Sequence, residues 1–94
     1  RGDVVTVHSL RRGAAEAIEA IARGKASTSR VVGRRVEDIA LPAGATINAI
    51  VRNGKVLQAH HDTVIENGDH LICFITDRRQ TEELQKLFQV DVDF

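Results

Sequence analysis

The chain has 94 residues, of which 43% are hydrophobic, and thirteen basic and thirteen acidic side chains give it a formal net charge of zero. This length supports one domain with a single core, and the balanced charge argues against nucleic-acid-binding proteins, which usually carry a basic excess. No apolar run approaches the ~20 residues of a membrane-spanning helix. Cys73 has no second cysteine to pair with, so a reducing intracellular compartment is the default expectation.

The first residues of the chain predict one strand and one ambiguous segment. Residues 3–10 are β-branched and partly alternating, which is typical of a strand. Residues 14–23 place apolar side chains at i, i+3, i+4 and i+7 from Ala14, and alanine and glutamate are strong helix formers. Periodicity by itself therefore favours a helix in this second segment. Since the chain contains no methionine, we expect it to be a piece of a longer protein.

A short helix is predicted after a small, polar loop. Val32, Val36 and Ile39 share one helical face. Pro42 disfavours the α conformation in the residue before it. We therefore expect a helix of about two turns that stops near Ala40.

The strongest strand signals predict an antiparallel meander of three strands, residues 46–52, 55–59 and 70–76. Asn53-Gly54 separates the first two strands, and this dipeptide predicts a hairpin because both central residues of a type I′ turn need φ > 0. The third strand contains a continuous apolar run. Such a run is typical of a strand that lies inside a sheet with both faces covered.

The last predicted element is a C-terminal helix. Asp77 is expected to cap its N-terminus, with Gln80 completing a partial capping box. Its buried stripe is predicted to be Leu84, Leu87 and Phe88. Residues 89–94 have no pattern, which predicts a disordered tail. The predicted fold class is thus α+β: a small, mostly antiparallel sheet with a short helix and a C-terminal helix, in one domain spanning residues 1–94.

The residues that could carry chemistry are few. His60, His61 and Asp62 are adjacent, but neighbours on a strand point to opposite faces, so the two imidazoles cannot easily share one metal ion. Cys73 lies in an apolar run, where burial should raise its pKa and make it unreactive. No phosphate-cradling glycine motif is present. Catalysis is not supported, although a metal-dependent or small-molecule-binding enzyme that uses His60, His61 and Asp62 stays open as the alternative.

Several segments at a specific spacing carry a family resemblance, namely residues 16–19, 32–36, 39–42, 49–54 and 62–71. With these segments the chain resembles, from about residue 4 to residue 88, the C-terminal (TrkA-C type) domain of RCK (regulator of potassium conductance) proteins. It is most similar to the last such module of bacterial Trk potassium-uptake regulators.

The resemblance implies a fold and a role. It implies a non-enzymatic α+β module that pairs with a copy of itself and transmits ligand state to a potassium channel subunit, in the cytoplasm at the inner face of the membrane. Any nucleotide cofactor is expected only in a Rossmann-type domain, whose fingerprint is absent here. The family also implies a strand at residues 14–22. We adopt that strand over the helix, because sheet pairing often overrides local propensity.

A small anionic ligand is the expected effector, bound near the dimer axis by Arg52 with His60 or His61. Arg52 ends the first strand of the predicted meander, and a two-fold axis would double each donor. An anion held there would gain charge-assisted hydrogen bonds that a neutral ligand would not make.

Overall fold

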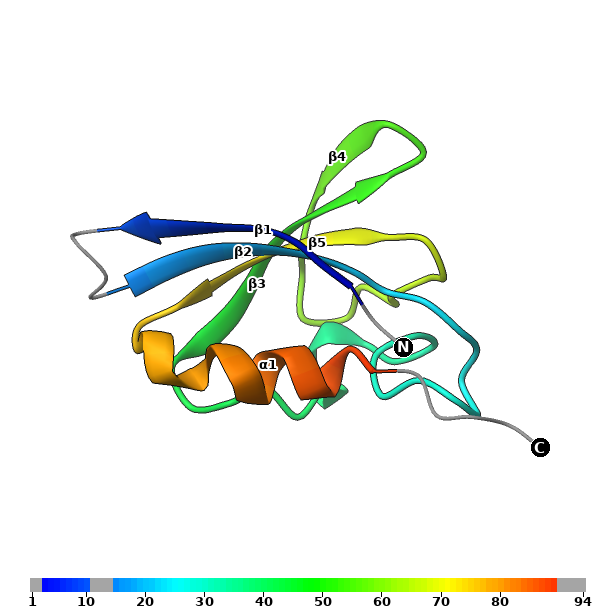
Figure 1. Ribbon diagram of the computed structural model, residues 1–94. Coiled ribbons are helices and arrows are strands. Elements are labelled where there is room, and N and C mark those ends of the chain that lie inside the picture. Colours follow the sequence, from blue (N-terminus) through cyan, green and yellow to red (C-terminus); the bar gives the residue numbers. More distant parts are fainter. Residues whose placement is uncertain (1–2, 11–14, 90–94) are drawn as a thin grey trace.

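The fold is a five-stranded antiparallel sheet with a helix and loops packed on one face (Figure 1). The computed structural model describes residues 3–10 and 15–89, with side chains from Glu16 onward. The strands are β1 (Asp3–Leu10), β2 (Ala15–Ile21), β3 (Ala45–Arg52), β4 (Lys55–Gln58) and β5 (His70–Ile75). Helix α1 (Thr81–Leu87) follows two 3-10 turns, η2 (Val36–Asp38) and η3 (Arg78–Gln80). The predicted α+β class is confirmed.

The strand order differs from the predicted meander. It runs β1-β2-β5-β3-β4, so β5 pairs with β2 and β3 and does not lie next to β4 in the sheet. Residues 59–69 give the chain enough length to return to the other side of β3. A central place lets β5 hydrogen-bond along both edges, whereas β4 is only four residues long and lies at the edge of the sheet.

Strand β5 is interior, as predicted, but only one of its faces is covered. Leu71, Cys73 and Ile75 are fully buried on the helix side. Phe74 points the other way and is 43% exposed. The expectation that both faces would be covered is therefore wrong, because the described helix and loops all pack on the same side of the sheet (Figure 1).

The ambiguous segment is strand β2, which confirms the strand that we adopted over a helix. It lies between β1 and β5 and pairs with both. Its neighbours thus satisfy the backbone donors and acceptors on both of its edges, which compensates for the low strand propensity of alanine. Ile18 and Ala20 reach the core, while Ala17, Glu19 and Ile21 lie on the opposite face.

The two-turn helix predicted to end near Ala40 is wrong, since only the three residues of η2 are helical there. The backbone N–H groups of Val36 and Glu37 donate to carbonyl oxygens in the 59–69 loop, those of Thr63 and His61, both at 2.9 Å. These contacts are long-range and compete with a helical hydrogen-bond ladder. Residues 33–37 therefore lie along the loop, and only the single 3-10 turn η2 forms.

Helix α1 buries its predicted stripe of Leu84, Leu87 and Phe88 against the sheet. Asp77 does act as an N-cap, since it accepts a hydrogen bond from the Arg79 backbone N–H at 2.9 Å, but it caps the 3-10 turn η3 that leads into α1. The N-cap of α1 itself is Gln80, which makes no side-chain cap bond. The capping box is not formed, since Gln80 Oε1 is buried and makes no hydrogen bond within the described residues. Across residues 3–10 and 15–89, no helix has the length and apolar character needed to cross a membrane.

The Asn53-Gly54 turn has the geometry of type I′, with φ of 51° and 77° at the two residues. We expect Gly54→Val to lower the free energy of unfolding by about 1–3 kcal/mol, because a β-branched residue is strained at positive φ. No heavy atom lies near a Cβ built there, so backbone strain is the sole cause. Chemical denaturation measures the loss, with Lys55→Val in the adjacent strand as the control. An unchanged stability would contradict the turn assignment.

Candidate functional site

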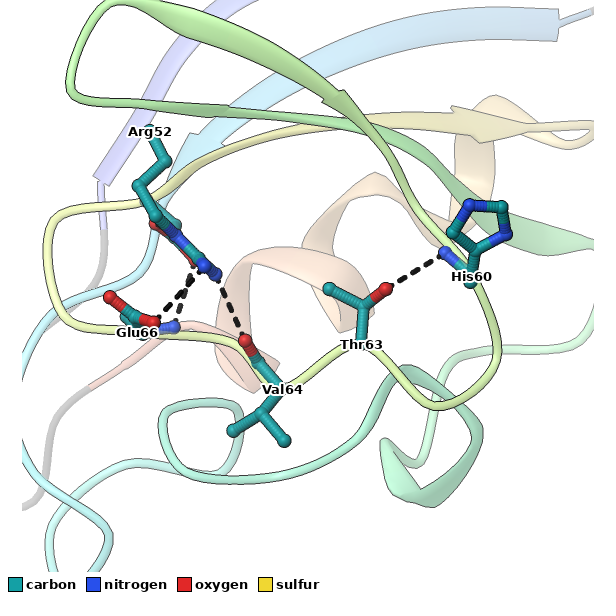
Figure 2. A network of polar contacts seen from close by, with 6 residues as sticks. Arg52, His60, Thr63, Val64 and Glu66 are labelled. Atoms are coloured by element: carbon teal, nitrogen blue, oxygen red, sulfur yellow. Dashed lines mark hydrogen bonds and ion pairs between the residues drawn. The ribbon is translucent and has the colours of Figure 1, made fainter.

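Arg52 and Asp69 form a bidentate ion pair between the end of β3 and the start of β5. Arg52 Nε donates to Asp69 Oδ1 at 2.9 Å, and Nη2 donates to Oδ2 at 2.8 Å. The same Nη2 donates to the Val64 carbonyl at 2.9 Å, and Nη1 pairs with Glu66 Oε2 at 3.0 Å. Figure 2 shows the guanidinium reaching across to Val64 and Glu66 in the 59–69 loop. Each of its three nitrogens therefore has a protein partner.

Asp69 is the most buried member of this network, with 1% of its side chain exposed. Besides the two bonds from Arg52, its Oδ2 accepts the Glu66 backbone N–H at 2.8 Å, which closes the turn before β5. The Asp69 carbonyl accepts the Ala22 N–H at 2.8 Å, and Ala22 in turn accepts from Gly68 N–H at 2.7 Å. One residue thus links the loop to the ends of β2 and β3.

The electrostatics of the pair follow from this geometry. The hydrogen bond to Asp69 raises the pKa of Arg52 above its ordinary value, and burial opposes that rise. A buried carboxylate is costly unless it is paired and hydrogen-bonded. Here the guanidinium and a backbone N–H supply those partners, so the pair can be accommodated at the edge of the core.

His60 and His61 lie in the same loop but away from this pair. The His60 backbone N–H donates to Thr63 Oγ1 at 3.1 Å, whereas His61 Nδ1 contacts Glu37 Oε2 at 2.7 Å. Within the described part of the chain, no hydrogen bond or ion pair joins Arg52 to either histidine. Thr63 and Val64 lie between Arg52 and His60 (Figure 2). The structure therefore places His60 and His61 on the loop that Arg52 contacts from the end of β3, without bringing either histidine into contact with Arg52.

The far side of the 59–69 loop is paired with residues 33–37. Gly33 N–H donates to the Ile65 carbonyl at 2.8 Å, and Ile65 N–H donates back to the Arg34 carbonyl at 3.0 Å. An isolated antiparallel bridge joins Arg35 and Val64. The loop is thus held by Arg52 on one side and by backbone pairing on the other. Local periodicity contains no signal for this pairing, because the partners are about thirty residues apart.

The described residues show little support for metal or thiol chemistry. Among the side chains that the structure describes, no group of three or more His, Cys, Asp and Glu is arranged to hold a metal ion. His61 is instead paired with Glu37. Burial raises the pKa of Cys73 to about 12, which keeps the thiol protonated, as predicted.

A separate depression of about 370 Å³ lies beside α1. It is lined by Arg30, Ala40, Glu83, Lys86, Leu87 and Gln89. None of the three predicted ligand-binding residues contributes to it, so it is not part of the Arg52 network.

Comparison with known proteins assigns the chain to a family. The sequence profile of the TrkA-C domain matches residues 25–89, well over half of the chain and including all of β3, β4, β5 and α1. The chain belongs to the TrkA-C domain family. The family resemblance inferred from the sequence is confirmed.

Curated relatives of this TrkA-C domain include proteins named Trk system potassium uptake protein TrkA. The protein from Halomonas elongata is 58% identical over 94 residues, covering 100% of this chain and 21% of the relative. The one from Vibrio alginolyticus is 56% identical over 89 residues, covering 95% and 19%. The one from Haemophilus influenzae is 42% identical over 94 residues, covering 100% and 20%. This TrkA-C domain therefore spans about a fifth of the length of these relatives.

Removing the charge of Asp69 tests whether its pair with Arg52 holds this TrkA-C domain together. We expect Asp69→Asn to lower the free energy of unfolding by about 2–4 kcal/mol, because it leaves Arg52 without its buried counter-charge. Glu66→Gln is the control, since that side chain is 61% exposed and should cost less than about 1 kcal/mol. Equal losses in the two variants, measured by urea denaturation, would contradict the central role of Asp69.

The contact between His61 and Glu37 makes a prediction about pH. The hydrogen bond to Glu37 raises the pKa of His61 above 6.5, so its NMR titration midpoint should lie above that value and fall towards it in Glu37→Gln. Since the folded-state pKa is raised, the pair stabilises the fold fully below the unfolded-state pKa. That contribution disappears as the pH rises through the folded-state pKa. Glu82→Gln, which alters a separate ion pair with Lys86, should leave the midpoint unchanged.

Proposed function

We propose that this TrkA-C domain is a regulatory module of bacterial potassium uptake, which pairs with a second copy and passes the state of a bound ligand to a potassium channel subunit. The observation that carries the proposal is the 58% identity, over the whole chain, to a protein named Trk system potassium uptake protein TrkA. In this proposal the module is non-enzymatic and works in the cytoplasm, at the inner face of the membrane, as part of a longer protein.

The ligand in this proposal is a small anion that binds Nη1 of the Arg52 guanidinium. Nη1 of that residue pairs with Glu66, whose side chain is 61% exposed. A phosphate could replace this exposed carboxylate while Nε and Nη2 keep their bonds to buried Asp69. Charge-assisted hydrogen bonds to phosphate are strong enough to compete with an exposed ion pair. His60 and His61 on the same loop are the proposed additional donors.

Calorimetric titration with AMP, ADP, ATP and inorganic phosphate at fixed salt tests this site. We expect wild type to bind at least one of these anions, Glu66→Gln to bind it several-fold more tightly, and Arg52→Ala to lose binding. The gain in Glu66→Gln follows from the removal of a competing carboxylate. His60→Ala and His61→Ala report whether either imidazole contributes.

Two outcomes would change the proposal. Undiminished binding by a folded Arg52→Ala variant would remove this residue from the site. An absence of binding by wild type would reduce the module to a pairing and coupling element.

The regulatory role is tested in cells that depend on the Halomonas elongata relative for potassium uptake. Replacing the matching segment of that protein with this chain should preserve uptake, measured as rubidium influx at low external potassium. Deleting the segment should abolish uptake or its regulation. A deletion that behaves like the intact relative would contradict the role.

A further inference from the structure

Two of the three asparagines in the chain are followed by glycine, as Asn53-Gly54 and Asn67-Gly68. Glycine has no Cβ to shield its backbone nitrogen or to limit its approach to the preceding side chain. The glycine nitrogen can therefore attack the Cγ carbon of the asparagine, which starts the loss of the side-chain amide. Both pairs contain the same reacting groups, so the surrounding structure decides which of them can react.

Asn53-Gly54 is the less restrained pair. It forms the tip of the β3–β4 hairpin, which projects from the rest of the sheet (Figure 1), and both residues are exposed. Within the described part of the chain, neither the Asn53 side chain nor the Gly54 N–H makes a hydrogen bond. No heavy atom outside the turn lies within 4 Å of a Cβ built on Gly54. The backbone of the turn is therefore the main restraint on the rotation that brings the Gly54 nitrogen to Asn53 Cγ.

Asn67-Gly68 is held at both of its reacting groups. The Gly68 N–H donates to the Ala22 carbonyl at 2.7 Å, and Asn67 Oδ1 accepts the Gly24 N–H at 2.9 Å. The attacking nitrogen must lose its proton, and the attacked side chain must rotate towards it. Both hydrogen bonds therefore have to break before this pair can react.

We propose that Asn53 is a site of non-enzymatic deamidation in the folded domain, and that the fold protects Asn67 from the same reaction. Hydroxide takes the Gly54 amide proton, and the nitrogen then forms a bond to Asn53 Cγ. The side-chain nitrogen takes a proton from water, which regenerates hydroxide, and leaves as ammonia. The product at this stage is a five-membered succinimide ring.

One water molecule then opens the succinimide ring. Cleavage of the bond between Asn53 Cγ and the Gly54 nitrogen gives aspartate, whereas cleavage on the side of the Asn53 backbone carbonyl gives isoaspartate. The net reaction consumes one water molecule, releases one ammonia and replaces a neutral amide by a carboxylate. No oxidant, reductant or enzyme is required.

The isoaspartate product changes the strand end that carries Arg52. Its chain continues through the former side chain, so the turn gains one backbone atom. A two-residue type I′ turn fixes the pairing of Arg52 with Lys55, and an extra atom does not fit that register. Since Arg52 Nε and Nη2 hold buried Asp69, the distortion also reaches the Asp69 network. The aspartate product keeps the original backbone and adds only a charge.

Ageing the 94-residue chain at mildly alkaline pH, both folded and in urea, tests the proposal. Peptide mapping with fragmentation that distinguishes aspartate from isoaspartate gives a rate at each asparagine. The protection at each site is its rate in urea divided by its rate in the folded chain, so the effect of flanking charges cancels.

We expect the protection of Asn67 to exceed that of Asn53 at least ~10-fold, since its turn must first break two hydrogen bonds. Asn48 is the internal control, because it precedes Ala49 within β3 and should stay intact in the folded chain. Equal protection of Asn53 and Asn67 would overturn the inference. A folded chain that stays intact at Asn53 while the chain in urea reacts there completely would also overturn it.

The variant Asn53→Asp separates the effects of the two products. Aspartate tolerates positive φ, so we expect this variant to unfold at the same urea concentration as wild type. The isoaspartate form, purified from the aged folded chain by liquid chromatography, should unfold at a lower urea concentration. Equal stability of these two forms would contradict the effect assigned to the extra backbone atom.

The inference goes beyond the proposed function and does not rest on it. Neither the deamidation rates nor the unfolding midpoints involve an anion, a second copy or a channel. A failure of anion binding or of potassium uptake would therefore leave the deamidation site standing, and an unreactive Asn53 would leave the regulatory role untouched.

Discussion

The structure depends on the burial of one carboxylate, that of Asp69. A buried negative charge is tolerated only where donors surround it, and here Arg52 and the Glu66 backbone N–H provide them. The donors come from different parts of the chain, so satisfying the carboxylate also fixes where those parts lie. The end of β3, the turn before β5 and, through the Asp69 carbonyl, the end of β2 are brought to one point.

This network has a consequence for the proposed ligand site. Three of the four interactions of Arg52 are with groups that hold the fold, and only the contact with Glu66 is made to a largely exposed side chain. A ligand can therefore compete for Nη1 without dismantling the loop. The same loop is hydrogen-bonded through its backbone to residues 33–37. A shift of the loop caused by a ligand at Arg52 would therefore also move residues 33–37, which gives binding a physical route to another part of the domain.

The two faces of the sheet have different roles in this picture. The covered face supplies stability, since Ile18, Ile50 and Leu71 are buried there beneath α1. The opposite face of β2 and β5 is partly exposed, with Phe74 at 43%, and carries the ion pair between Glu19 and His70.

Local patterns predicted several elements correctly. Asn53-Gly54 predicted a type I′ turn, because few other dipeptides accept positive φ at both positions, and both angles are positive. The stripe of Leu84, Leu87 and Phe88 predicted the buried face of α1, and the apolar surroundings of Cys73 predicted an inert thiol. The segments that resemble the TrkA-C family predicted the family itself.

The sequence by itself determined the Asn53-Gly54 turn, the buried stripe of the C-terminal helix and the unreactive thiol of Cys73, because each depends on neighbours within a few positions. Tertiary structure decided the rest. Strand β5 lies between β2 and β3 because pairing on two edges satisfies its backbone, and the alanine-rich segment is a strand because β1 and β5 flank it. Arg52 became part of the fold because a carboxylate seventeen positions later is buried beside it. Such long-range pairings leave no trace in local periodicity, since the groups that compete for each hydrogen bond become neighbours only once the chain has folded.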